Sequence, residues 1–220
     1  MYNYKLLIVF IIFVSSSALL SAAERVDPLK VFLKEFETLQ SNFTQTLLSE
    51  DGEQLEKTTG TLYLQQPGKF NWHYKEPYVQ KIITNGEVLW IYDEDLEQLT
   101  IRNFESDMIE RTPAAIILGN SRLEQHFVQL DLGNIEGFHW VELTPRDLDA
   151  QYKNIRIGFD AKRLGMMIIT DNLGQTTRID FSDVNKNSKL SADLFNFSAP
   201  ADIDVIDERQ TVTTEHEQTR

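Results

Sequence analysis

Cysteine is absent from the 220-residue sequence. The chain therefore has no disulfide framework, no thiol nucleophile and no cysteine-ligated metal site. Basic residues are also few, because 21 lysines and arginines stand against 34 aspartates and glutamates, for a formal net charge of −13. This sign argues against nucleic acid and against anionic membrane surfaces as electrostatic partners.

No segment beyond the N-terminus approaches the about 18 apolar residues of a membrane-spanning helix. At the N-terminus, Lys5 precedes an apolar run at 6–14, and a segment of small residues follows in which Ser21 and Ala23 fit the rule for signal-peptidase cleavage. We therefore predict a cleaved signal peptide at residues 1–23, against the alternative of an uncleaved anchor. Its removal takes away one lysine and no acid, so the net charge becomes −14.

An exported chain without cysteine fits the periplasm of a Gram-negative bacterium better than a disulfide-dense secreted protein. It cannot itself be a bacterial lipoprotein, because the acylated residue of such proteins is a cysteine. The length suits one domain, which we place at residues 24–207, and we predict a disordered acidic tail at 208–220.

Helical periodicity is confined to two places. Apolar residues recur at helical spacing from Pro28 to about Gln40, with Asp27 as the N-cap, and this predicts a first helix. A second, short apolar helix is expected within residues 112–127, around Ile116, Ile117 and Leu118.

The rest reads as short strands separated by turn signals, of which Asn85-Gly86 is the sharpest two-residue hairpin signal. About eleven strands are expected, at residues 42–49, 60–66, 69–75, 79–84, 87–93, 96–103, 127–132, 138–145, 153–159, 165–171 and 175–184. A sheet of this size must curl on itself. The predicted fold class is mainly β (α+β), a curved, incomplete antiparallel barrel.

The sequence contains no recognisable catalytic set. Its four histidines (His73, His126, His139 and His216) lack metal-ligand spacing, and neither a G-x-S-x-G element nor a phosphate-binding loop is present. The acidic stretch at 93–97 is interpreted as a solvated hairpin turn, and His73 as a surface histidine. We expect no cofactor, no metal and no enzymatic activity.

Apolar residues alternate in consecutive strands and, if these pair as hairpins, form one aromatic-rich face. The residues concerned are Leu62, Leu64, Phe70, Trp72, Tyr74, Ile82, Val88, Trp90 and Tyr92. The pattern leaves two interpretations open, an ordinary core or a ligand cavity. The short helix at Ile116–Leu118 would act as a lid over such a cavity.

The stretch "GTLYLQQPGKFNWHYKEPYVQKIITNGEVLWIYDEDLEQLT" (residues 60–100) closely resembles the signature block of the periplasmic outer-membrane lipoprotein carrier family, LolA. The resemblance extends through Phe43-Thr44-Gln45, "TPAAIIL" at 112–118 and the stretch at 165–176, and so covers essentially the whole mature chain.

The resemblance implies an incomplete antiparallel barrel whose hydrophobic concave side is covered by a helical lid. It implies a monomeric carrier that accepts acylated lipoproteins from an inner-membrane ABC transporter and hands them to the outer-membrane receptor LolB. That receptor is itself a lipoprotein, so the missing cysteine separates the two roles. The acyl chains would contact the aromatic-rich face and Ile116, Ile117 and Leu118.

One position departs from the family pattern. The family usually has arginine before the proline of its R-P-G-x-F-x-W motif, where it is thought to hold the lid through hydrogen bonds, and this sequence has Gln66. Glutamine still donates to carbonyl groups but lacks the charged guanidinium fork. We expect Gln66 to act as a weaker lid latch. The alternative functions are a binder or sensor of another lipid or glycolipid and, less favoured, an enzyme acting on envelope lipids.

Overall fold

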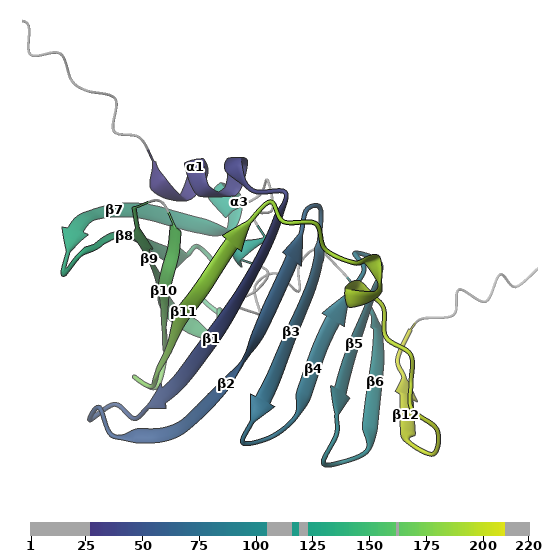
Figure 1. Ribbon diagram of the computed structural model, residues 1–220. Helices are drawn as coiled ribbons and strands as arrows, with labels where there is room; N and C mark the ends of the chain where they lie inside the picture. The colour runs from purple at the N-terminus through teal and green to yellow at the C-terminus, as the bar shows by residue number, and fades with distance from the viewer. Residues whose placement is uncertain (1–26, 105–115, 119–122, 162, 210–220) are drawn as a thin grey trace, which may run out of the picture.

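The computed structural model describes residues 27–104, 116–118, 123–161 and 163–209. Within them, twelve strands form one sheet in the order β12-β6-β5-β4-β3-β2-β1-β11-β10-β9-β8-β7 (Figure 1). The strands are β1 (Thr38–Leu48), β2 (Gln54–Gln65), β3 (Lys69–Glu76), β4 (Gln80–Thr84), β5 (Val88–Asp93), β6 (Gln98–Asn103), β7 (Phe127–Ile135), β8 (Phe138–Pro145), β9 (Tyr152–Asp160), β10 (Arg163–Asp171), β11 (Thr176–Lys186) and β12 (Asp204–Asp207). The predicted signal peptide lies outside the described residues.

The sheet is strongly curved and open, with β7 and β12 as its two edges (Figure 1). All neighbouring strands pair antiparallel except β12, which runs parallel to β6. This confirms the predicted incomplete barrel. Among the described residues, no helix is long and apolar enough to cross a membrane.

The described helices are α1 (Pro28–Glu35), α3 (Leu123–His126) and the 3₁₀ turn η2 (Ala192–Phe195). The predicted start of the first helix is confirmed, because the Asp27 carboxylate accepts hydrogen bonds from the backbone N–H groups of Leu29 and Lys30 at 3.0 and 3.1 Å.

The predicted end of that helix at Gln40 is wrong. Phe36 is already extended, and β1 begins at Thr38, where Leu39 pairs with Leu64 on one side and Lys186 on the other. Strand pairing on both sides satisfies the backbone hydrogen-bonding groups of this segment. Burial of the segment between two strands outweighs the helical periodicity of its sequence.

The twelfth strand was not predicted. After η2 the chain returns to the open edge, where Asp204–Asp207 pairs with β6 and the Glu208 N–H donates to the Ile101 carbonyl at 2.8 Å. All four β12 residues are exposed, and the two apolar residues of its sequence, Val205 and Ile206, are adjacent, so no apolar alternation marks the strand. The described chain reaches Arg209, two residues into the predicted tail, and residues 210–220 lie outside the described residues.

One face of the sheet carries the main hydrophobic core. Strands from β7 at one edge to β5 near the other contribute to a single buried cluster, which only the concave side of a curved sheet can bring together. We call this side the inner face. Its buried members come from α1, residues 116–118 and the strands: Leu29, Phe32, Phe36, Leu39, Phe43, Leu62, Leu64, Phe70, Trp72, Leu89, Ile116, Ile117, Leu118, Phe127, Val141, Leu143, Ile155, Ile157, Phe159, Leu164, Met167, Ile179 and Phe181.

Candidate functional site

Six of the predicted lipid-contacting residues lie together on the inner face. In the β2–β3 ladder, Leu62 is paired with Trp72 and Leu64 with Phe70, and these four side chains are at most 2% exposed. The other two, Tyr74 and Ile82, are partly buried and pack against the same cluster. Period-2 alternation therefore placed these six residues on one face, and their role in lipid binding stays a prediction.

Aromatic packing at the centre of this face depends on Gly60. The Phe43 ring lies 4.9 Å from Trp72 and 5.3 Å from Tyr74, measured between ring centroids. A Cβ atom added to Gly60 would lie 2.6 Å from Phe43 Cζ and 2.1 Å from the His73 carbonyl oxygen. Only glycine lets the Phe43 ring cross β2 at this distance.

Trp90 and Tyr92 do not belong to this face, and the prediction that they share it, with Val88, is wrong. Ile83 pairs with Trp90 and Ile82 with Ile91, so Leu89 and Ile91 point inward instead. Thr84 pairs with Leu89, so four residues lie between the last paired positions of the hairpin rather than two.

When an even number of residues lies between two paired positions, every even-numbered residue of the first strand pairs with an odd-numbered residue of the second. Paired residues share a face, so the even-numbered Ile82 shares its face with the odd-numbered positions of β5. This count of residues across the turn was the signal that could have identified Leu89 and Ile91 from the sequence.

The described part of the predicted lid covers the inner face. Ile116 and Ile117 are helical, and with Leu118 they are 1–6% exposed within the core cluster. The remainder of the predicted short helix, at 112–115 and 119–122, lies outside the described residues.

Helix α1 forms a second cover. Its buried Leu29 and Phe32 enter the same cluster, and the Phe32 ring lies 5.4 Å from Phe159 of β9. The amphipathic spacing that predicted the helix also marks these two contact residues, which the sequence analysis did not assign to the site.

Gln66 contacts the last turn of α1. Its Nε2 donates a hydrogen bond to the Leu33 carbonyl at 3.0 Å. Asn187 holds the same end: its side chain accepts from the Glu37 N–H at 2.8 Å and donates to the Glu35 carbonyl at 3.0 Å. The expected donation from Gln66 to a carbonyl is thus present, and its effect as a lid latch stays a prediction.

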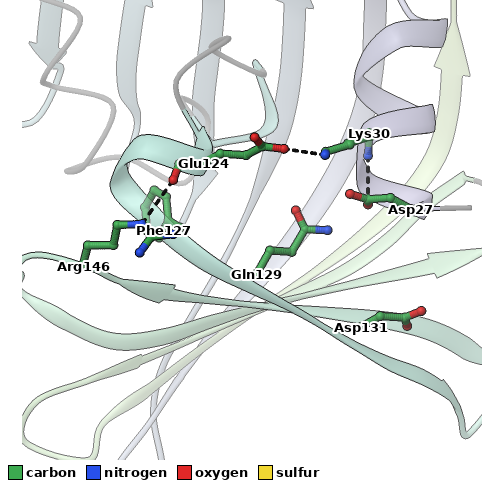
Figure 2. Close-up of a pocket in the computed structure, with 7 residues that line it drawn as sticks. All are labelled: Asp27, Lys30, Glu124, Phe127, Gln129, Asp131 and Arg146. Carbon is green, nitrogen blue, oxygen red and sulfur yellow. Dashed lines mark hydrogen bonds and ion pairs between the residues drawn. The ribbon is translucent and has the colours of Figure 1, made fainter. Parts of the chain in front are cut away.

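At the other end of α1, a groove of about 410 Å³ separates the helix from α3 and β7 (Figure 2). Lys30 forms an ion pair with Glu124 across it, and Arg146 Nε donates to the Glu124 carbonyl at 3.1 Å. The hydrogen bond and charge of the pair raise the pKa of Lys30 and lower that of Glu124. The ion pair therefore links α1 to α3 across the solvent-exposed groove.

Residues with possible chemical roles have ordinary positions. His73 faces away from the inner face, and burial together with Lys81 and Lys75 lowers its pKa. The stretch at 93–97 forms the β5–β6 turn, where Asp93 accepts from the Leu96 N–H at 3.1 Å. Among the described residues, no group of histidine, aspartate and glutamate side chains could hold a metal ion.

Comparison with known proteins gives a consistent result. The family model described as outer membrane lipoprotein carrier protein LolA matches residues 34–198. An outer-membrane lipoprotein carrier protein of Dechloromonas aromatica (strain RCB) is 38% identical over 190 residues, which cover 86% of this chain and 91% of the relative. Its counterpart in Methylococcus capsulatus is 39% identical over 181 residues, or 82% and 86% of the two chains.

Among solved structures, an uncharacterized conserved protein from Thermus thermophilus aligns with a TM-score of 0.53 over 81% of this chain and 96% of that one. Its 12% identity makes this a likeness of fold alone. The family match and the two relatives confirm the resemblance found in the sequence. This chain belongs to the outer membrane lipoprotein carrier protein LolA family.

Proposed function

We propose that this protein is a periplasmic carrier of acylated lipoproteins, which encloses the acyl chains of its cargo against the inner face. The observation that carries the proposal is the construction of that face. A continuous apolar surface from β7 to β5 is covered by α1 and by residues 116–118 rather than by a second sheet. Family membership and the names of the relatives point to the same cargo.

The size of the cargo explains why a carrier is needed. An N-terminus bearing three acyl chains exposes roughly 45 methylenes, so at about 0.8 kcal/mol each its transfer into water costs about 35 kcal/mol. Free diffusion of such a molecule between membranes is excluded.

The inner face is filled by the protein's own side chains when α1 and residues 116–118 are in place. Loading therefore requires these covers to move, at a cost of roughly 1.5–3 kcal/mol for each large apolar side chain uncovered. Acyl chains entering the same surface recover that cost, so the covers form a two-state element that the ligand biases. In this proposal the cargo comes from an inner-membrane ABC transporter and leaves to the receptor LolB.

The test is a loading experiment. The purified protein is mixed with the reconstituted transporter or with spheroplasts, and the soluble fraction is analysed for a one-to-one complex with a lipoprotein. Co-purification of free phospholipid without any released lipoprotein would instead favour a carrier or sensor of another lipid.

Matched variants locate the loading surface. Phe70→Glu should abolish loading, because it places a charge at the centre of the inner face. Since that variant can also unfold the protein, we pair it with Ile82→Glu on the inner face and Ile101→Glu on the outer one, both at half-buried positions. Normal loading by Ile82→Glu would return this face to the role of a plain core.

A further inference from the structure

The inner face changes character at one end. Beyond Tyr74, a cavity of about 240 Å³ is lined by Gln45, Thr58 and Tyr74 together with Glu56, Gln80 and Asp93. Thr58 lies seven residues from Gln65, the last residue of β2, or roughly 23 Å at 3.3 Å per residue, so the cavity is far from the α1 end of the sheet. Pairing of Gln45 with Thr58 and of Gln80 with Tyr74 puts these side chains on the inner face.

The cavity contains an unused hydrogen-bonding group. Thr58 is only 5% exposed, and among the described residues its Oγ1 has no hydrogen-bond partner. Leaving a buried hydroxyl unpaired costs free energy, so native proteins rarely do so without a further use for the group. The neighbouring Tyr74 hydroxyl makes one long bond, to Gln45 Oε1 at 3.3 Å, which leaves it able to accept another partner.

The charge of the cavity is negative. Glu56 and Asp93 both line it, and no lining residue within the described ranges is basic. The field acts on Tyr74, whose pKa is raised to about 12 by burial and by the charge of Glu56. Phosphate sites in proteins are built from arginine, lysine or helix N-termini, so this cavity disfavours a phosphate group.

We propose that this end of the inner face is the subsite for the ester and amide carbonyls that join acyl chains to a lipoprotein N-terminus, and that its carboxylates exclude phospholipid phosphate. The inference rests on the proposed carrier function and adds a basis for selectivity to it. The Thr58 hydroxyl donates to a carbonyl oxygen of the linkage, while the chains lie along the apolar part of the face. The cavity is smaller than the roughly 300–1,000 Å³ that enclose a whole drug-sized ligand, as suits the polar part of a larger one.

The first test uses Thr58→Val, which keeps the side-chain shape and removes the hydroxyl. The probe is a synthetic tripalmitoylated cysteinyl peptide, with binding followed by tryptophan fluorescence. We expect affinity to fall by about three- to tenfold, as for one lost neutral hydrogen bond, while resistance to urea stays the same or rises. The control is Thr59→Val, whose side chain points to the opposite face and should leave affinity unchanged.

The second test uses Glu56→Gln combined with Asp93→Asn and compares the same lipopeptide with dipalmitoyl phosphatidylglycerol. The wild-type protein should prefer the lipopeptide, and the double variant should narrow that preference by roughly three- to tenfold through tighter phospholipid binding.

The outcomes separate the two proposals. If the wild type binds the lipopeptide and Thr58→Val binds it with the same affinity, the subsite alone is overturned. The same holds if the double variant keeps the wild-type preference for lipopeptide over phosphatidylglycerol. A wild-type protein that binds phosphatidylglycerol but no lipopeptide would overturn the carrier function as well.

Discussion

The two faces of strands β3–β6 are both buried, but by covers of different construction. On the inner face, Phe70 and Trp72 belong to the buried cluster to which α1 and residues 116–118 also contribute. On the outer face, Ile83, Tyr92 and Leu99 are buried outside that cluster, and the chain after β11 contributes their cover. Phe197 packs on Tyr92 at 5.1 Å, and Figure 1 shows η2 on the near side of the sheet.

The outer cover is fixed along its length. It leaves the sheet from β11 and rejoins it at β12, and in between Asn71 Nδ2 donates to the Leu194 carbonyl at 2.7 Å. Helix α1 of the inner cover is held by its buried Leu29 and Phe32 side chains. At its ends it adds short polar contacts from Gln66, Asn187 and Lys30. The difference fits the proposed carrier function, in which the outer apolar layer is a permanent core and the inner one is a surface that cargo uncovers.

Phe195→Ala, in the outer cover, should lower the free energy of unfolding more than any other substitution that we propose for comparing the two layers. Phe195 is 1% exposed, so its truncation should cost about 3–5 kcal/mol of the free energy of unfolding, measured with urea. Lipopeptide binding should persist below the unfolding transition. Leu173→Ala, at an exposed turn, is the control and should change stability little. Loss of binding in folded Phe195→Ala would show that the two layers are not independent.

Gly60→Ala tests the inner layer. The new Cβ would meet the His73 carbonyl oxygen and the Phe43 ring, which should cost about 1–3 kcal/mol in overpacking and change the near-ultraviolet circular dichroism of Trp72. Because the closest contact is with backbone, a further Phe43→Ala change should restore only part of the stability. Full restoration of stability would mean that the Phe43 ring alone, and not the His73 carbonyl, requires glycine at position 60.

The part of the inner face on β2–β4 was predicted because period-2 alternation holds wherever one side of a strand is apolar. The pattern fails for β5, since Leu89, Trp90 and Ile91 are all apolar and only the length of the preceding connection decides which of them point inward. It fails again for β2, whose first residues, Gln54 to Thr59, are polar except for Leu55 and were not assigned to a strand.

The proposed subsite around Thr58 lay beyond sequence reasoning for a different reason. An unpaired hydroxyl is a property of its neighbours in space, and no local spacing reveals it. The C-terminal end of α1 likewise depends on pairing between Leu39 and residues far along the chain.

Gln66→Arg should strengthen the inner cover moderately. A guanidinium in place of the amide would make a charge-assisted hydrogen bond to the Leu33 carbonyl, at the negative end of the α1 dipole, worth about 1 kcal/mol more than the present bond. Hydrogen exchange of the α1 amides should slow by about fivefold. Gln65→Arg, which adds the same charge on the opposite face, is the control. Equal protection of α1 in the wild type and Gln66→Arg would contradict a latch at this position.

Glu124→Gln should have the smallest effect, because Lys30 and Glu124 are 62% and 69% exposed. The lowered pKa of Glu124 means that its contribution is present above its ordinary value of 4.5 and is lost as pH falls through the folded value. The raised pKa of Lys30 means that its contribution is present below pH 10.5 and is lost at higher pH.

Between these two pH limits, Glu124→Gln should slightly speed hydrogen exchange of the α1 amides, and 1 M salt should abolish the difference from the wild type. Asp207→Asn, in β12, removes an exposed pair with Arg209 at the opposite edge of the sheet from β7 and α1, and should leave α1 exchange unchanged. A salt-independent effect of Glu124→Gln would mean that packing of α3, rather than the ion pair, holds this end of the inner cover.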